Sequence, residues 1–228
     1  AGAAPASSPG VSESTKTIDE AKVDGAIRRF ELRFFLYDSS AEKSIVELAC
    51  SSSIKAHANQ HPTYGAAGEA KGPEMSQRTM HPPLLYLYSA MVKLWGRRER
   101  TFDEAAKLVR IVADAQERGA IELTGKEEAH MAAVRLFLRR DFAGVIDHYG
   151  RFLREQSPED TVALRMVILA VFFSGHTGRA FRVFESVKAH NWGCATFMSH
   201  YCLSGSFSGL ASPSELDAIM AEASKLAP

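Results

Sequence analysis

The sequence predicts an all-α fold in which helical hairpins stack into an α-α superhelix. Residues 124–191 read as four consecutive helices with short breaks, because apolar side chains recur there at helical spacing. The break that begins at Asp141 recurs at His176, about one 34-residue period later, which indicates a repeat of helix pairs. The longest apolar run, Met166 to Phe173, is far shorter than the ~18 to 20 residues of a membrane-spanning helix. We expect it to form a helix buried in the core.

Residues that favour helix ends recur at distances suited to a chain of antiparallel helices. A Ser or Thr followed within three residues by an acidic residue satisfies the free amide groups of a first helical turn. Gly119 and Gly175 are placed as helix stops, since glycine adopts the left-handed conformation that ends many helices. The predicted helix starts are Thr101 with Glu104, Thr124 with Glu127, Ser157–Pro158 with Asp160, and Ser212–Pro213 with Glu215.

The composition is that of a globular protein with no bulk charge to attract nucleic acid. Of the 228 residues, 46% are hydrophobic, and Lys plus Arg equal Asp plus Glu at 27 each. Three cysteines, Cys50, Cys194 and Cys202, are too few for a disulfide framework and fit a reducing compartment. The chain begins at Ala1 with a small, polar stretch, which is typical of a mature end left by removal of a targeting peptide, or of a trimmed chain.

The chain divides into four parts. Residues 1–16 lack large apolar side chains and are expected to form a flexible arm. Residues 17–60 contain two segments with helical spacing, which predict two N-terminal helices. Residues 61–82 are rich in Gly and Pro and lack periodicity, so they predict a long loop that serves as a contact element. Residues 83–228 contain the helical repeat array.

Small side chains face large ones across the predicted hairpins of this array. In the central pair, one face is expected to meet the next helix: Ala129, Ala132, Ala133 and Leu136 against Val145, Tyr149 and Phe152. A small face lets the partner helix approach closely, as in tetratricopeptide repeats. The repeat spacing is irregular, so we describe the hairpins as degenerate and tetratricopeptide-like. In the following pair, one apolar face is expected to meet another: Leu164, Ile168 and Val171 against Ala180, Phe184 and Val187.

Several short motifs within residues 41–228 carry a resemblance to a known family. A charged residue and a His open a helix, followed by Ala, at Glu128, His130 and Ala133. An Asp-Phe turn follows at Asp141 and Phe142, and a Pro-x-Asp-x-x-Ala-Leu helix start lies at Pro158, Asp160, Ala163 and Leu164. A Ser-x-Tyr segment followed by Phe and Leu is carried by Ser199, Tyr201, Phe207 and Leu210. The chain thereby resembles the tetratricopeptide repeat protein 38 family, as a divergent and truncated member. Residues 61–82 form an insertion relative to that family, whose members continue for further helical repeats. The resemblance implies an α-α superhelix without known chemistry.

No residue pattern predicts catalysis. The chain has no nucleophile elbow, no phosphate-binding glycine loop and no zincin helix motif. Acidic pairs at Glu127 and at Glu159 lie at helix starts, where capping is their ordinary role. The metal-capable types His190, Cys194, His200 and Cys202 lack the tight Cys pairs that structural zinc favours. We therefore predict no enzyme activity, no cofactor and no metal. A metal-dependent enzyme using that His/Cys cluster is the alternative.

Aromatic and basic residues are the candidate partner-binding residues. Adjacent Phe34 and Phe35 cannot both face the core side of one helix, which indicates a partner surface. Arginines cluster at two neighbouring helix ends, where they predict a basic patch for RNA phosphates or an acidic protein. The alternative for the arginines is a solvated face with local ion pairs. The full set of predicted contact residues is Phe34, Phe35, Tyr64, Arg97, Arg98, Arg139 and Arg140.

These patterns predict a scaffold. We expect an accessory subunit that binds other protein subunits of a large complex of the respiratory-chain type, because short repeat arrays leave exposed end faces. The N-terminal composition favours a mitochondrial location, with the cytoplasm as the alternative. The second function hypothesis is an RNA-binding helical-repeat protein of an organellar ribosome. Neither hypothesis includes a transmembrane segment.

Overall fold

The computed structural model describes residues 20–34, 42–49, 82–95 and 98–226, and every regular element in them is helical. This confirms the predicted all-α fold. The predicted arm at 1–16 and nearly all of the predicted loop at 61–82 lie outside the described residues. In chain order the helices are α1 (Glu20–Phe34), helix 42–49, α3 (Pro83–Trp95), α4 (Glu99–Glu117), α5 (Gly125–Leu138), α6 (Phe142–Glu155), α7 (Thr161–Ser174), α8 (Thr177–Ser186), α9 (Lys188–Asn191), α10 (Ala195–Ser208) and α11 (Pro213–Leu226).

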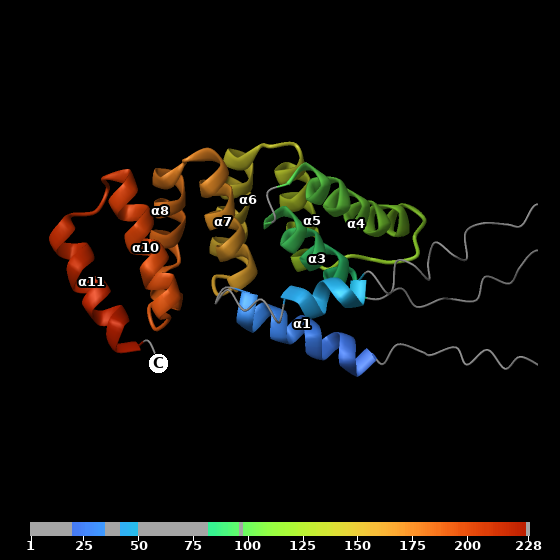
Figure 1. The fold of residues 1–228 in the computed structure, drawn as a ribbon, viewed down its shortest axis with the longest axis horizontal. Helices are drawn as coiled ribbons and strands as arrows, with labels where there is room; N and C mark the ends of the chain where they lie inside the picture. The colour runs from blue at the N-terminus through green and yellow to red at the C-terminus, as the bar shows by residue number, and fades with distance from the viewer. Residues whose placement is uncertain (1–19, 35–41, 50–81, 96–97, 227–228) are drawn as a thin grey trace, which may run out of the picture.

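The helices from α3 onward stack as hairpins into an α-α superhelix (Figure 1). The hairpins are α3 with α4, α5 with α6, α7 with α8, and α10 with α11. The second helix of each hairpin also contacts the first helix of the next one, so α4 packs on α5, α6 on α7, and α8 on α10. Equivalent helices meet as well, as in the contacts of α3 with α5 and of α6 with α8. This repeating contact pattern produces the superhelix.

Two predicted helix starts are confirmed in detail. At α5, the Glu127 amide donates to Thr124 Oγ1, and the Thr124 amide donates to the Glu127 carboxylate at 2.8 Å. At α11, the Glu215 amide donates to Ser212 Oγ at 3.3 Å. The predicted start at Ser157–Pro158 is wrong by about one turn, because α7 begins at Thr161 and its N-terminal cap is Asp160, whose Oδ1 accepts from the Ala163 amide.

The predicted start at Thr101 is wrong by about one turn. Helix α4 begins at Glu99, and Arg98 is its N-terminal cap. Thr101 occupies the third helical position, where its hydroxyl donates to the Arg98 carbonyl oxygen and accepts from the Arg98 amide. The threonine side chain therefore still satisfies a backbone group of the first turn, but from inside the helix.

The predicted stops at Gly119 and Gly175 are confirmed. Gly175 caps the end of α7 with a φ of 71°, and Gly119 follows α4 with a φ of 68°. A side chain at either position would be strained, because non-glycine residues rarely adopt this left-handed conformation.

The core runs through the array between the hairpins. Helices α5 and α6 pack on each other, and most residues predicted to lie between them are buried. The buried ones are Ala129, Ala133, Val145, Tyr149 and Phe152, whereas Ala132 and Leu136 are only partly buried. The apolar run predicted to lie in the core, Met166 to Phe173, lies within α7 and is buried as far as Ala170. The prediction is wrong for its last turn, where Phe172 is 50% exposed. None of the helices in the described part of the chain has both the length and the apolar composition that crossing a membrane requires.

The N-terminal helices fold back onto the array. Helix α1 contacts α3 and α7, and Figure 1 shows it crossing the array, with its C-terminal end near α7. Helix 42–49 is held by the same two array helices. Ser89 Oγ of α3 donates to the Ile45 carbonyl oxygen at 3.0 Å, and Arg165 of α7 pairs with Glu42 at 2.6 Å. The array therefore has an additional helical layer over part of one face.

His200 makes the stability of the fold depend on pH. Burial in α10, together with the charge of Arg165, lowers the pKa of His200 to about 4. The unfolded chain binds a proton at this site near pH 6.5, so the stabilisation is complete above that pH and is lost as pH falls toward 4. Lowering the pH from about 7 to about 5 is expected to cost about 2 kcal/mol at this site.

Urea unfolding at these two pH values tests this expectation. The His200→Leu variant should lose much of the difference between the two pH values, whereas a matched change of exposed His190 to Gln should retain it. An unchanged pH dependence in His200→Leu would show that His200 does not carry the effect.

Candidate functional site

A cluster of polar side chains lies beneath α1, at the point where it meets the array. The cluster draws on α1, α3, α5, α6 and the N-terminal cap of α7, although these segments are far apart in the sequence. We call it the polar cluster; it consists of Glu31, Tyr88, Lys126, His130, Tyr149 and Asp160.

Lys126 joins two carboxylates at the centre of the polar cluster. Its Nζ lies 2.8 Å from Glu31 Oε1 and 3.1 Å from Asp160 Oδ2. Glu31 Oε1 also accepts a hydrogen bond of 2.7 Å from the Tyr88 hydroxyl, and the backbone oxygen of Glu31 accepts one from Thr161 Oγ1. Glu31 therefore attaches α1 to three array helices.

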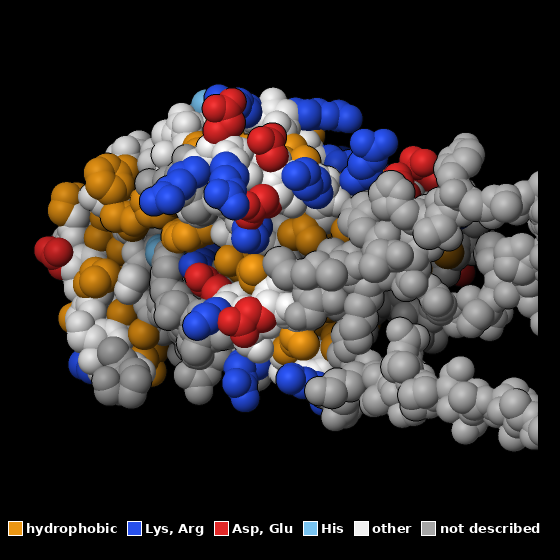
Figure 2. All heavy atoms as spheres, turned by 45° about the vertical axis from the view of Figure 1, so that its right-hand side comes forward, with side chains coloured by type: hydrophobic (Ala, Val, Ile, Leu, Met, Phe, Trp, Pro, Cys, Tyr) orange, Lys and Arg blue, Asp and Glu red, His pale blue; other side chains and the backbone are white. Residues whose placement is uncertain are grey.

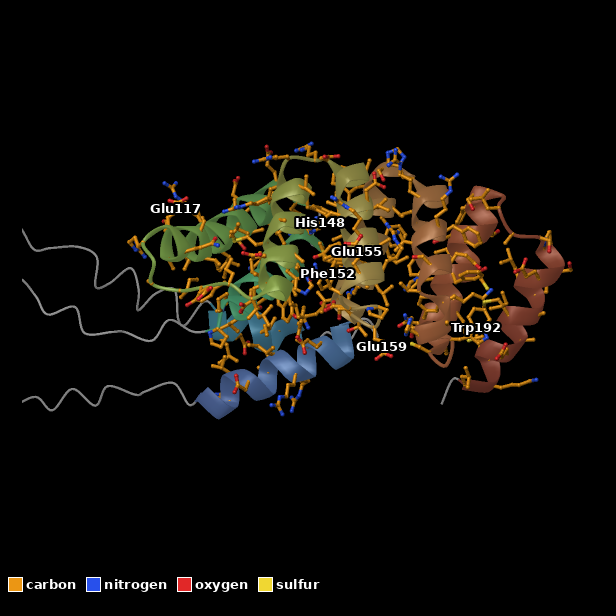
Figure 3. All side chains as sticks on the ribbon, turned by 180° about the vertical axis from the view of Figure 1, so that it is seen from behind. Glu117, His148, Phe152, Glu155, Glu159 and Trp192 are labelled. Carbon is orange, nitrogen blue, oxygen red and sulfur yellow. The ribbon has the colours of Figure 1, made fainter. Side chains whose placement is uncertain are left out.

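His130 forms the deepest part of the cluster. Its side chain is fully buried on α5, with Nδ1 3.1 Å from the Tyr149 hydroxyl and Nε2 3.6 Å from Asp160 Oδ2. The rings of Tyr88 and Phe152 lie against it, with centroid distances of 5.4 and 5.7 Å. Phe152 is labelled on α6 in Figure 3.

The electrostatics fix the charge states of Asp160, Lys126 and the two tyrosine hydroxyls near neutral pH. Burial opposes the charge of Asp160, but the neighbouring His130 ring, the Lys126 ammonium and the Ala163 amide outweigh it, and the pKa of Asp160 falls below its usual range. Burial also opposes the charge of Lys126, yet Asp160 and Glu31 raise its pKa. Burial and the Asp160 charge raise the pKa of the Tyr88 and Tyr149 phenols. Asp160, Lys126 and the two phenols are therefore poor proton-transfer groups and effective structural anchors.

A pocket of about 330 Å³ opens beside the cluster, between α1 and the start of α7. Figure 3 shows Glu159 beside the end of α1 at this place. The pocket wall is mainly charged and includes Arg28, Glu31, Lys126, Glu159, Asp160 and Thr161. Glu31 and Asp160 already bind Lys126 here, so we interpret the pocket as the edge of the site where α1 attaches to the array.

Replacing Glu31 by Ala is expected to loosen α1. The change removes the carboxylate that binds Tyr88 and Lys126. A hydrogen bond to a charged group contributes about 1.5–3 kcal/mol to stability when buried, and less here because both partners of the Lys126 pair are partly exposed. We expect α1 amides to exchange with solvent roughly tenfold faster, which hydrogen-exchange mass spectrometry measures. Arg29→Ala changes an exposed residue of the same helix and is the matched control. Equal exchange rates in the two variants would contradict the anchoring role.

A second feature is a groove between α6 and α8. It has a volume of about 470 Å³, and we call it the α6–α8 groove. Its lining includes Arg151 and Arg154 from α6, and Arg179 and Arg182 from α8, together with Asp147 and Gly150. Asp147 pairs with Arg179.

A third feature is the apolar surface of α10 and α11, the last hairpin. Figure 2 shows hydrophobic side chains gathered at this end of the molecule. Phe207 is 72% exposed, and Leu203, one helical turn earlier, is 40% exposed. Five large apolar side chains of this hairpin and its connecting segment are exposed, and we call them the apolar end: Leu203, Phe207, Leu210, Met220 and Leu226.

The residues predicted to contact a partner are only partly placed. Helix α1 ends at Phe34, whose side chain lies outside the described residues, as do Phe35, Tyr64 and Arg97. The other three predicted residues, Arg98, Arg139 and Arg140, are exposed.

The structure brings none of these three arginines into a described pocket. Arg98 caps α4, Arg139 caps the C-terminal end of α5, and Arg140 turns the chain with a φ of 61°. Their neighbour Arg100 pairs with Glu104 at 3.1 Å, as in the alternative of a solvated face.

The sequence interpretation missed both the polar cluster and the α6–α8 groove. A signal for the groove existed, because the pattern Arg-x-x-Arg occurs at 151–154 and again at 179–182, on equivalent helices of adjacent hairpins. No comparable signal existed for the polar cluster, since Glu31 reaches it only through the folding back of α1.

Two members of the predicted His/Cys cluster, His200 and Cys202, are buried in α10, whereas His190 is exposed. Cys202 Sγ lies 3.7 Å from the Leu216 carbonyl oxygen and holds α10 to α11, and His200 is buried in the same helix. Within residues 20–34, 42–49, 82–95 and 98–226, no three His, Cys, Asp or Glu side chains gather in a way that could hold a metal ion.

Comparison of the chain with protein-family models, with curated proteins and with solved structures gives no significant match.

Proposed function

We propose that the protein is a non-catalytic helical-repeat scaffold, an accessory subunit that binds neighbouring proteins of a larger assembly. The proposal includes a mitochondrial complex of the respiratory-chain type as that assembly, with the cytoplasm as the alternative location, and divergent membership of the tetratricopeptide repeat protein 38 family. The apolar end carries the proposal, because large apolar side chains gathered on one surface mark interaction sites.

The geometry of the apolar end supports an amphipathic helix of a partner protein as its occupant. Leu203 and Phe207 lie one turn apart on α10, which matches the spacing of side chains on an apposed helix. The buried side of α11 uses Leu216, Ile219 and Ala223 to pack on α10, so that hairpin is already closed on its inner side. A partner helix would extend the stacking of the array.

The alternative of an organellar RNA-binding protein has less support. Its predicted patch relies on Arg98, Arg139 and Arg140, which are exposed at helix ends and outside the described pockets. Sequence-tolerant RNA binding combines such charges with aromatic side chains on which bases stack. The arginines that do share a groove are those of α6 and α8.

A photoreactive amino acid at position 207 tests the scaffold proposal. We expect irradiation of native extract to join this position to a defined protein, with the linked residue on an apolar helical face. The same photoreactive group at exposed Arg110, on α4, is the control and should give no such product. Crosslinks to RNA alone, or between two copies of this chain alone, would contradict a scaffold for other subunits.

A further inference from the structure

The α6–α8 groove is built to receive negative charge. The two arginines on each helix are three residues apart, so each pair projects from one helical face about one turn apart. Guanidinium groups bind carboxylates through paired hydrogen bonds. Four guanidinium groups therefore line the groove from two sides, with α6 and α8 in direct contact beneath them.

Gly150 allows the two helices to approach closely at this point. A Cβ atom on Gly150 would lie 2.8 Å from Val183 Cγ2 and 3.3 Å from a terminal nitrogen of Arg154. The absence of a side chain lets the α6 and α8 backbones lie close together, and the arginine pairs of both helices then line one groove.

The positive charge of the groove is only partly compensated within the described residues. Asp147 pairs with Arg179, which shows that the groove geometry suits a carboxylate. In the part of the chain that the structure describes, Arg151, Arg154 and Arg182 have no ion pair within 4 Å. Like charges that line one groove repel one another, and an acidic ligand would relieve that repulsion.

The lining favours a protein ligand over RNA. None of the residues that line the groove is aromatic, so bases would find no stacking surface there. An acidic helix, by contrast, presents carboxylates at three- and four-residue spacing, which matches the one-turn separation of the arginines.

We infer that the α6–α8 groove binds an acidic segment of a partner protein through Arg151, Arg154 and Arg182. This inference adds a second binding site to the scaffold proposal. It rests on that proposal, because it takes the ligand to be a protein. The groove and the apolar end use different residues on different hairpins, so each can fail without the other.

Fluorescence anisotropy tests the inference on the full chain. The probe is a labelled helical peptide of about 16 residues with Glu at three- and four-residue spacing, and a labelled single-stranded RNA of similar charge is measured in parallel at about 50 mM salt. The test variant reverses the charge of Arg151, Arg154 and Arg182 to Glu. The matched control reverses Arg98, Arg139 and Arg140, so the net charge changes equally. Circular dichroism confirms that both variants are helical.

We expect the peptide to bind the wild-type chain and the control, and to bind the groove variant at least about tenfold more weakly. Leu203→Ser with Phe207→Ser should leave peptide binding unchanged, which separates this site from the apolar end. No peptide binding to the wild-type chain, equal loss in the groove variant and the control, or binding of the RNA in place of the peptide would each overturn the inference.

Discussion

Replacing Phe137 by Ala is expected to lower the free energy of unfolding by about 4 kcal/mol, because the change opens a cavity in the aromatic core of the array. Phe137 on α5 is fully buried. Its ring lies 6.1 Å from that of Phe102 on α4, 5.0 Å from that of Phe142 on α6 and 5.3 Å from that of Phe173 on α7. One side chain therefore joins four helices from three hairpins.

Urea unfolding followed by circular dichroism measures this loss, with Phe207→Ala as the matched control. Phe207 is 72% exposed, so the same truncation should change the free energy of unfolding by less than about 0.5 kcal/mol. Equal effects of the two substitutions would mean that the core does not run through Phe137.

Replacing Asp160 by Asn is expected to lower the free energy of unfolding by about 3 kcal/mol. Asparagine can still cap α7, so the change removes the charge and largely preserves the cap. Lys126 then loses its partner at 3.1 Å, and His130 loses the carboxylate 3.6 Å away. Removing one partner of a buried ion pair costs about 3–5 kcal/mol, because it leaves an uncompensated charge.

The Asp160→Asn substitution should also change how the free energy of unfolding depends on pH. The pKa of Asp160 is lower in the folded chain than in the unfolded one, so its stabilisation is present above the unfolded value near 3.8 and is lost as pH falls below it. Wild type and Asp160→Asn should therefore approach each other in stability in acid. Asp147→Asn, at an exposed ion pair, is the control and should cost less than about 1 kcal/mol. A loss below that value for Asp160→Asn would contradict the role of the polar cluster.

The local parts of the fold could be predicted from the sequence because they depend on near neighbours. The start at Thr124 and the stop at Gly175 follow from residue type, since one bonds an amide three residues on and the other adopts a positive φ. The start at Thr101 was misplaced because a hydroxyl can bond the first turn from within the helix as well as from its cap.

The surfaces of the molecule could not be predicted in the same way, because they depend on tertiary contacts. Lys126 meets Glu31 only because α1 folds back over the array, and no local pattern around either residue indicates that contact. Arg151 and Arg182 each read as a solvated residue on its own helix, and they become a groove only when α6 packs beside α8. The exposure of Phe207 likewise depends on how α10 and α11 close on each other.

The apparent mass of the native particle that contains this protein tests the central claim most directly. The chain itself has a mass of 24.9 kDa. Native electrophoresis of gently solubilised extract gives the apparent mass of the complex that contains it. The scaffold account predicts a particle many times heavier, from which the Leu203→Ser and Phe207→Ser double variant is released while remaining folded. Migration of the wild-type protein at the mass of a single chain would contradict that account.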